Sequence, residues 1–182
     1  TVISSLLNLE MGNLSDDNSR NIFQNSITRI NSLSSIYEQL YSTDDISRID
    51  LNIYLSNLIE SLVKTYKINE NIVLVTSIKE GSYIDLKRSV LIGLIFNELL
   101  TNSMKYAYPS NGKGIINAGF HIESGTAMMY VKDEGCGIPA DYNIESAKSL
   151  GLKLVKMLTE QLDGKLEIKA EEGTHVRIKC SI

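Results

Sequence analysis

The chain has 182 residues, a hydrophobic content of 43% and a formal net charge of -4. These values are ordinary for a globular protein that buries one sizeable core, with room for an appendage. The isoelectric point is near 5.2, whereas nucleic-acid-binding domains normally show a basic patch or an alkaline isoelectric point, so we expect no nucleic-acid partner.

Cysteine and histidine are too few for a metal-ligand cluster: the chain has 2 of each. We therefore predict no zinc site and two free thiols in a reducing compartment. The longest apolar run, Val90 to Phe96, is far shorter than the roughly 20 residues that a membrane span needs. No charged segment followed by an apolar one suggests a signal peptide, so we expect a cytoplasmic fragment without membrane contact of its own.

Two helices are predicted before residue 42. The first begins at the start of the chain without a capping residue, so we expect it to be the end of a longer helix. The second runs from Ser19 to Tyr41 with apolar residues close to a heptad spacing, and Gly12 to Asn18 forms a connector. Such a hairpin usually pairs with a second one in a four-helix bundle. The alternative is that both helices pack on the domain that follows.

The remaining chain, after a linker at Ser42 to Asp45, alternates between helical and strand periodicity. The order of elements suggests helices layered on one face of a mixed sheet, an α+β fold. The predicted helices are one with apolar residues from Leu51 to Leu62, one capped by Asp85 that ends near Tyr108, and Leu150 to Leu162. The predicted strands are Ile72 to Ile78, Tyr83 to Leu86, Gly114 to Ile122, Thr126 to Lys132, Lys165 to Lys169 and His175 to Ile182.

A polar stripe interrupts the most apolar helix. Glu98, Asn102 and Lys105 stand four and then three residues apart, so they share one helix face. The preceding Val90 to Phe96 is apolar all round, as expected for a helix buried on most sides. A carboxylate, an amide oxygen and an ammonium on one face suit a metal-bound phosphate ligand. The alternative is a solvated helix face, which is commoner for a polar triplet.

Three glycine-containing segments follow in the second half. Asp133 to Pro139 (D-E-G-C-G-I-P) comes directly after a predicted strand, where glycines allow a close backbone approach and a carboxylate can accept from an exocyclic amine. Ser149 to Leu152 places a glycine at a helix start, which favours a phosphate. Gly173-Thr174 offers a hydroxyl before the last strand. Each segment alone could equally be a turn or a cap.

Taken in order, these segments resemble the N box, the two glycine boxes and the closing Gly-Thr of the gyrase, heat-shock chaperone, histidine kinase and mismatch-repair ATPase superfamily. I-S-S-L-L-N-L-E at Ile3 to Glu10 and I-Y-E-Q-L-Y-S at Ile36 to Ser42 are similar to the second type of histidine kinase hairpin. The resemblance implies a Bergerat ATP-binding fold, a two-layer α/β sandwich, over residues 45–182, and a partial dimerisation and histidine-phosphotransfer hairpin over residues 1–44.

The resemblance also implies a role for each matching residue. Asn102 would ligate Mg²⁺, Glu98 would orient or polarise the reacting group, and Lys105 would meet the phosphates, so these three would be catalytic. Asp133 would read the adenine amine, and residues 140–149 would form a short lid. The residues around the ATP cofactor would be Asn102, Lys105, Tyr106, Asp133, Gly135, Gly137, Ile138, Leu150, Gly151, Leu152 and Thr174.

The implied protein is the catalytic core of a two-component sensor histidine kinase, which dimerises through the hairpin and passes phosphate to a response regulator receiver domain. In that family the acceptor histidine would lie roughly two to three helical turns before residue 1. No histidine precedes His121, through truncation or true loss, so we expect nucleotide binding without autophosphorylation at the usual site. The alternatives are a serine kinase of the anti-sigma-factor type and a pseudokinase scaffold.

Overall fold

The computed structural model describes residues 48–66, 71–109, 112–138, 150–170 and 172–182, together with single positions and short runs between residues 5 and 34. The predicted linker at residues 42–45 and the predicted lid at residues 140–149 lie outside the described residues. Within the described part of the chain, no helix combines the length and the apolar character needed to cross a membrane.

The main sheet has five strands in the order β2, β4, β5, β7, β6. β2 runs parallel to β4 and every other neighbouring pair is antiparallel, so the sheet is mixed, as predicted. In β5 the side chains of Ala127, Met129 and Val131 are buried and alternate with less buried neighbours, which is the period of a strand with one covered face. The strands are β2 Ile72–Ile78, β4 Gly114–Glu123, β5 Thr126–Asp133, β6 Lys165–Lys169 and β7 Thr174–Ser181.

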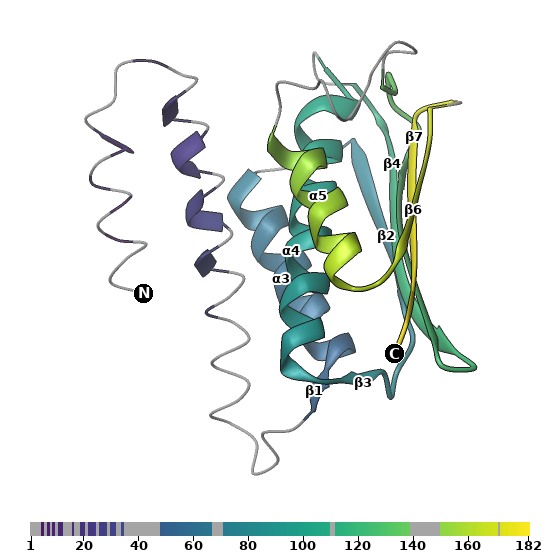
Figure 1. The fold of residues 1–182 in the computed structure, drawn as a ribbon. Helices are drawn as coiled ribbons and strands as arrows, with labels where there is room; N and C mark the ends of the chain where they lie inside the picture. The colour runs from purple at the N-terminus through teal and green to yellow at the C-terminus, as the bar shows by residue number, and fades with distance from the viewer. Residues whose placement is uncertain are drawn as a thin grey trace.

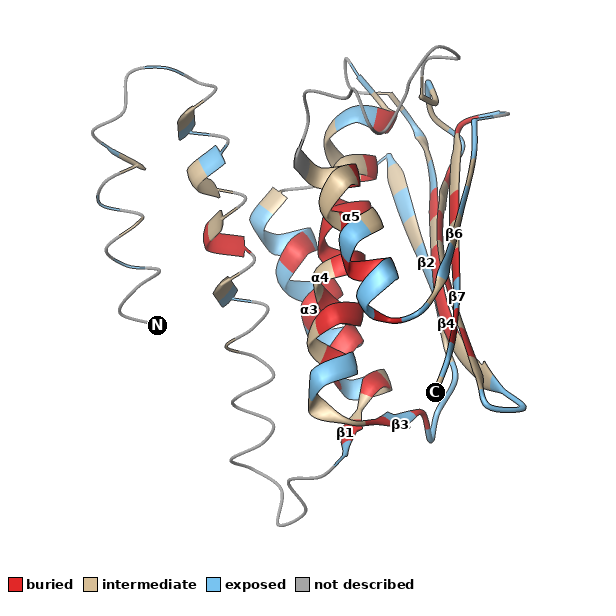
Figure 2. Cartoon of the chain, in the orientation of Figure 1, coloured by how far each residue is buried: buried red, intermediate tan, exposed pale blue. Residues whose placement is uncertain are grey.

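Three helices cover one face of this sheet: α3 Leu51–Tyr66, α4 Leu86–Asn102 and α5 Leu150–Gln161 (Figure 1). Buried residues gather on the facing sides of the helices and the sheet (Figure 2). α4 packs against both α3 and α5, and nearly all of its residues from Leu91 onward are buried. This arrangement confirms the predicted α+β class and explains why the α4 sequence is apolar all round.

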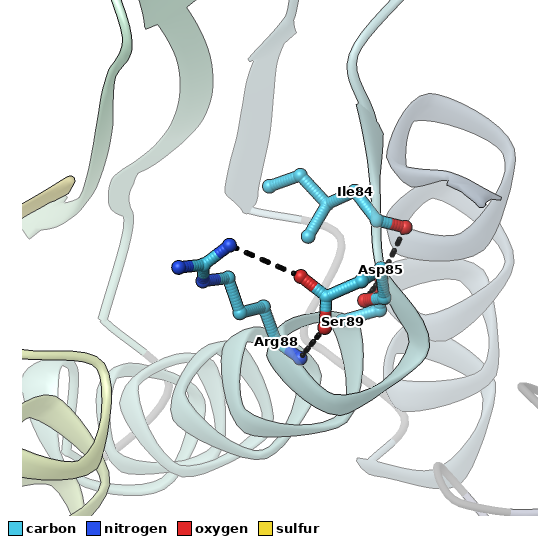
Figure 3. Close-up of polar contacts among 4 residues, drawn as sticks. All are labelled: Ile84, Asp85, Arg88 and Ser89. Atoms are coloured by element: carbon cyan, nitrogen blue, oxygen red, sulfur yellow. Dashed lines mark hydrogen bonds and ion pairs between the residues drawn. The ribbon is translucent and has the colours of Figure 1, made fainter. Parts of the chain in front are cut away.

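Asp85 caps α4, as predicted. Its Oδ1 accepts a hydrogen bond from the Arg88 backbone N–H at 3.0 Å, and its Oδ2 accepts one from the Arg88 guanidinium at 3.2 Å (Figure 3). The Ser89 hydroxyl donates to the Asp85 carbonyl at 2.9 Å. A capping carboxylate satisfies an N–H group that has no partner within the first helical turn. The cap therefore defines where the helix that carries the polar stripe begins.

One predicted strand is shorter than expected, and one predicted helix changes its type before its end. The strand expected to reach Leu86 is β3, Tyr83–Ile84, and it stops there because the next residue caps α4. β3 pairs with β1, Ile49–Asp50, which is too short to show a period and was not predicted. The helix expected to continue to Tyr108 is α-helical only to Asn102, and a π-helix, η1 Ser103–Ala107, follows it. The other predicted strands are confirmed, with ends shifted by at most one residue.

α3 and α4 approach closely at Gly93. The buried residues of α3 begin at Leu51 and recur at the spacing that predicted the helix. A Cβ atom at Gly93 would overlap with the Tyr54 side chain, so the Tyr54 ring occupies space that any other residue at position 93 would fill. Burial raises the pKa of Tyr54, and its hydroxyl has no hydrogen-bond partner among the described residues. Packing of the ring thus outweighs the cost of an unsatisfied hydroxyl.

The described N-terminal positions are helical between residues 5 and 12 and again between residues 19 and 34. Asp16 lies at the start of the second helical stretch, where its Oδ1 accepts from the Ser19 N–H at 2.8 Å. Gly12 was expected in the connector but is helical. A single glycine does not prevent a helix from forming. The second stretch lies beside α3 (Figure 1), where the Thr28 and Tyr66 hydroxyls are 3.3 Å apart.

Candidate functional site

The last turns of α4 carry a buried carboxylate and a half-buried amide. Glu98 is only 5% exposed, and the Asn97 side-chain amide donates to its Oε1 at 3.2 Å. Asn102 lies one turn further on, at the end of α4. A buried charge needs polar partners, and Asn97, to which the motif gave no role, is one of them. The structure therefore keeps Glu98 and Asn102 on adjacent turns, as their spacing predicts.

Lys105 lies in the π-helix and is half-buried. Burial lowers the pKa of its ammonium group below the ordinary value, and the negative charge of Glu98 opposes this shift. The Lys105 Nζ also lies 5.0 Å from the centre of the Tyr66 ring. A partly dehydrated ammonium can bind an anionic ligand with less water to remove than a fully hydrated one.

Ser103, the first residue of the π-helix, contacts the sheet. Ser103 is buried, and its hydroxyl donates to the Asp133 Oδ2 at 2.8 Å. Sequence reasoning gave this residue no role, although it lies within the polar motif at the end of the predicted helix. The signal available was a small polar residue at an otherwise buried part of the helix.

Asp133, at the end of β5, is held by hydrogen bonds to both of its oxygens. Its Oδ2 accepts from Ser103, and its Oδ1 accepts from the backbone N–H groups of Gly135 at 3.2 Å and Thr174 at 3.1 Å. The carboxylate is only 3% exposed. These donors fix its orientation, and an oxygen atom of an ionised carboxylate can accept more than one hydrogen bond. A carboxylate held in one orientation at a strand end can therefore recognise a hydrogen-bond donor on a ligand.

Glycines allow the loop after β5 to lie directly on the π-helix. A Cβ atom at Gly135 would overlap with the Ala107 carbonyl, and one at Gly173 would overlap with the Asp133 carbonyl. The Cys136 N–H donates to the Ala107 carbonyl at 2.9 Å. Gly137 has a φ of 72°, a left-handed conformation that glycine adopts without strain. The structure thus explains both glycines of the first glycine segment by backbone geometry.

Gly151 brings the second glycine segment to the polar stripe. A Cβ atom there would lie 3.1 Å from the Glu98 Oε2 and 3.5 Å from the Asn102 Nδ2. Gly151 is in the first turn of α5, where backbone N–H groups lack helical partners and the helix dipole favours an anion. The beginning of α5 and the end of α4 therefore meet around the same small region.

The other predicted ligand residues differ in their exposure. Tyr106 is 64% exposed and Leu152 is 8% exposed, so Leu152 belongs to the hydrophobic core. Ile138 is half-buried against that core. Leu150 is the first residue of α5. Tyr106 is thus more exposed than Ile138 and Leu152.

Tyr108 also shapes the site, although the motifs did not indicate it. Its hydroxyl donates to the Ile115 carbonyl at 2.7 Å and accepts from the N–H groups of Ile115 at 3.0 Å and Glu134 at 2.9 Å. Desolvation is the main cause that raises the pKa of this hydroxyl. A Cβ atom at Gly114 would overlap with the Tyr108 ring. The ring therefore joins the end of η1 to β4 and to the loop after Asp133.

The donor set suits a metal ion that arrives with a phosphate. Among the described residues no group of three or more His, Cys, Asp and Glu side chains could hold a metal ion. Asn102 is half-buried at the end of α4, and its amide oxygen lies next to Gly151. Mg²⁺ typically keeps several waters and takes few protein ligands besides substrate phosphates. One amide oxygen near a helix N-terminus fits that pattern.

Two family models match the chain. Residues 1–66 match a family described as "Histidine kinase". Residues 87–182 match a family described as "Histidine kinase-, DNA gyrase B-, and HSP90-like ATPase". The second match includes every predicted site residue, from Glu98 to Thr174.

Curated relatives are longer than this chain. Sensor histidine kinase PdtaS of Mycobacterium tuberculosis is 22% identical over 184 residues, which cover 99% of this chain and 36% of the relative. Blue-light-activated histidine kinase 2 of Erythrobacter litoralis is 32% identical over 89 residues, which cover 48% of this chain and 26% of the relative. The chain therefore spans about a third of the length of the first of these relatives, and less of the second.

Solved structures share the fold. The histidine kinase domain of the Erythrobacter litoralis EL346 blue-light activated histidine kinase has a TM-score of 0.79 at 24% identity, covering 98% of this chain and 81% of that chain. Mycobacterial sensor histidine kinase MprB has a TM-score of 0.58 at 19% identity, covering 74% of this chain and 95% of that chain.

Proposed function

Because the chain belongs to the histidine kinase family, with an ATPase domain of the DNA gyrase B and HSP90 type, we propose that it is the catalytic core of a two-component sensor kinase. It binds Mg-ATP and transfers the γ-phosphoryl group to a histidine and onward to a response regulator. We assign the acceptor role to neither His121 nor His175, since both lie within strands of the sheet. Residues 45–182 form the ATP-binding domain, and residues 1–44 contribute to a hairpin through which the protein dimerises.

One observation carries this proposal: Gly151 lies against both Glu98 and Asn102. The three residues come from two helices that are far apart in the sequence, and they were predicted from two separate motifs. The contact brings a potential metal ligand, a carboxylate and a helix N-terminus close together. These are the groups that phosphoryl transfer requires, because its catalysis consists mostly of positioning and charge neutralisation.

The residues divide between the two ends of the nucleotide. Asp133 accepts a hydrogen bond from the adenine amine, in the orientation that Ser103 and the backbone donors hold. At the phosphate end, Lys105 neutralises negative charge, and the N–H groups at the start of α5 donate to phosphate oxygens. Asn102 holds the metal through its amide oxygen, and Glu98 orients the reacting group. Bound Mg²⁺ supplies further neutralisation of the phosphate charge.

Isothermal titration of ATP into Asn102→Ala tests this assignment. Even second-shell substitutions at metal sites typically cost about 10- to 100-fold in metal affinity, so we expect at least about a tenfold loss of ATP affinity with Mg²⁺ present. With the metal chelated, the variant and the unaltered chain should bind ATP similarly. Asn57→Ala, at an exposed position of α3, is the matched control and should change neither value. Equal Mg²⁺-dependent affinity in Asn102→Ala and the unaltered chain would disprove the assignment.

A further inference from the structure

One side chain contacts both the N-terminal hairpin and the predicted phosphate-binding lysine. Tyr66, the last residue of α3, places its hydroxyl 3.3 Å from the Thr28 hydroxyl in the second helical stretch. The ring of the same residue lies beneath Lys105, whose Nζ is 5.0 Å from the ring centre. The three residues come from three separate elements, so only the tertiary structure brings them together.

The hydroxyl contact has a defined direction. Thr28 donates its single hydroxyl proton to the Gln24 carbonyl at 2.8 Å. Its oxygen can therefore only accept from Tyr66, which acts as the donor. Thr28 is 6% exposed and the adjacent Ile27 is 3% exposed, so this part of the hairpin is covered. The position of the Tyr66 hydroxyl thus depends on where the hairpin lies.

The ring contact restrains a flexible cation. An ammonium within about 6 Å of an aromatic ring centre is attracted to the ring face, more strongly when it is partly dehydrated. Lys105 is half-buried, so this condition holds. An ammonium has three N–H donors, so Lys105 can remain over the ring while it donates to a phosphate. The ring therefore limits the conformations that Lys105 would otherwise lose on binding a ligand.

We propose that Tyr66 is a positioning residue that holds the Lys105 ammonium for the nucleotide phosphates and links its position, through Thr28, to the docking of the hairpin. This inference rests on the proposed function. Since one side chain makes both contacts, hairpin docking and nucleotide binding favour each other. Thermodynamic linkage requires that this effect be reciprocal.

The first test compares ligands with and without phosphates. In the 182-residue chain, Tyr66→Leu removes both contacts, and the expected loss of Mg-ATP affinity is about 2- to 10-fold. Adenosine, which has no phosphate, should bind to Tyr66→Leu and to the unaltered chain equally well. Tyr66→Phe keeps the ring and should lose less ATP affinity than Tyr66→Leu. Tyr83→Leu replaces an exposed tyrosine and should leave both affinities unchanged.

The second test measures the hairpin. Saturating Mg-ATP should slow amide hydrogen exchange around Ile27 and Thr28 in the unaltered chain. In Tyr66→Phe and Tyr66→Leu the nucleotide should leave this exchange unchanged, because the hydroxyl that connects the two sites is gone. A purely structural role for Tyr66 would not produce this difference between nucleotide-bound and nucleotide-free protein.

Three results would overturn the inference while leaving the proposed function intact. The first is that Tyr66→Leu binds ATP as tightly as the unaltered chain does. The second is that this variant loses ATP affinity and adenosine affinity equally. The third is that Mg-ATP does not change amide hydrogen exchange of the hairpin in the unaltered chain. Failure of the unaltered chain to bind Mg-ATP at all would overturn the proposed function, and this inference with it.

Discussion

Replacing Ser103 with alanine should show how far a buried hydroxyl prepares Asp133 for the adenine base. The Ser103 hydroxyl donates to the Asp133 Oδ2 at 2.8 Å, whereas the backbone donors on Oδ1 lie at 3.2 and 3.1 Å. Ser103→Ala removes the shortest of these hydrogen bonds and keeps the other two. The carboxylate should then be less restrained at Oδ2, while the loop that carries it stays in place.

Two quantities should change in Ser103→Ala: the free energy of unfolding and the dissociation constant for ATP. Hydrogen bonds to charged groups typically contribute about 1.5–3 kcal/mol, so the free energy of unfolding should fall by roughly that amount in Ser103→Ala. The loosened Asp133 must be immobilised again when adenine binds, which costs about 0.5–1.5 kcal/mol. Since about 1.4 kcal/mol corresponds to a factor of ten, the dissociation constant for ATP should rise by about 2- to 12-fold.

Urea denaturation measures the first quantity and isothermal titration of ATP measures the second. Ser89→Ala is the matched control, because Ser89 is also buried but lies in α4, where it donates to the Asp85 carbonyl at the beginning of the helix. Ser89→Ala can lower stability but should leave ATP affinity unchanged. The reasoning is refuted if Ser103→Ala binds ATP as the unaltered chain does, or if Ser89→Ala loses as much ATP affinity.

Two further substitutions test the base reading and the helix packing. Asp133→Asn keeps an oxygen that can accept from the backbone donors but loses one charge-assisted hydrogen bond to the base. The preference for ATP over GTP in competition binding should therefore fall by about 10- to 100-fold. An unchanged preference would mean that this carboxylate does not recognise the base. Gly93→Ala should lower the free energy of unfolding in urea by about 1–3 kcal/mol, because its Cβ would overlap with Tyr54. Gly12→Ala meets no atom within 4 Å and should not destabilise, so equal stability of the two variants would contradict the packing argument.

The sequence by itself predicted most of the elements and the motif residues of the candidate site. The buried residues of α3 are the ones whose helical spacing predicted that helix, and Asp85 caps α4. These signals are local, since each depends only on residues within a turn or a strand. The order of the motifs also selected Glu98, Asn102 and Gly151, which the structure brings together.

Only the tertiary structure decided how those residues are held. Ser103 reaches Asp133 across 30 residues, and Tyr108 reaches Glu134 across 26. Both contacts require the π-helix to lie on the end of β5, and the spacing of residues in the sequence does not predict that these two segments meet. The link from Thr28 through Tyr66 to Lys105 has the same origin. Side-chain spacing indicates which residues share a face, whereas hydrogen bonds between distant segments form only once the helices and the sheet have packed.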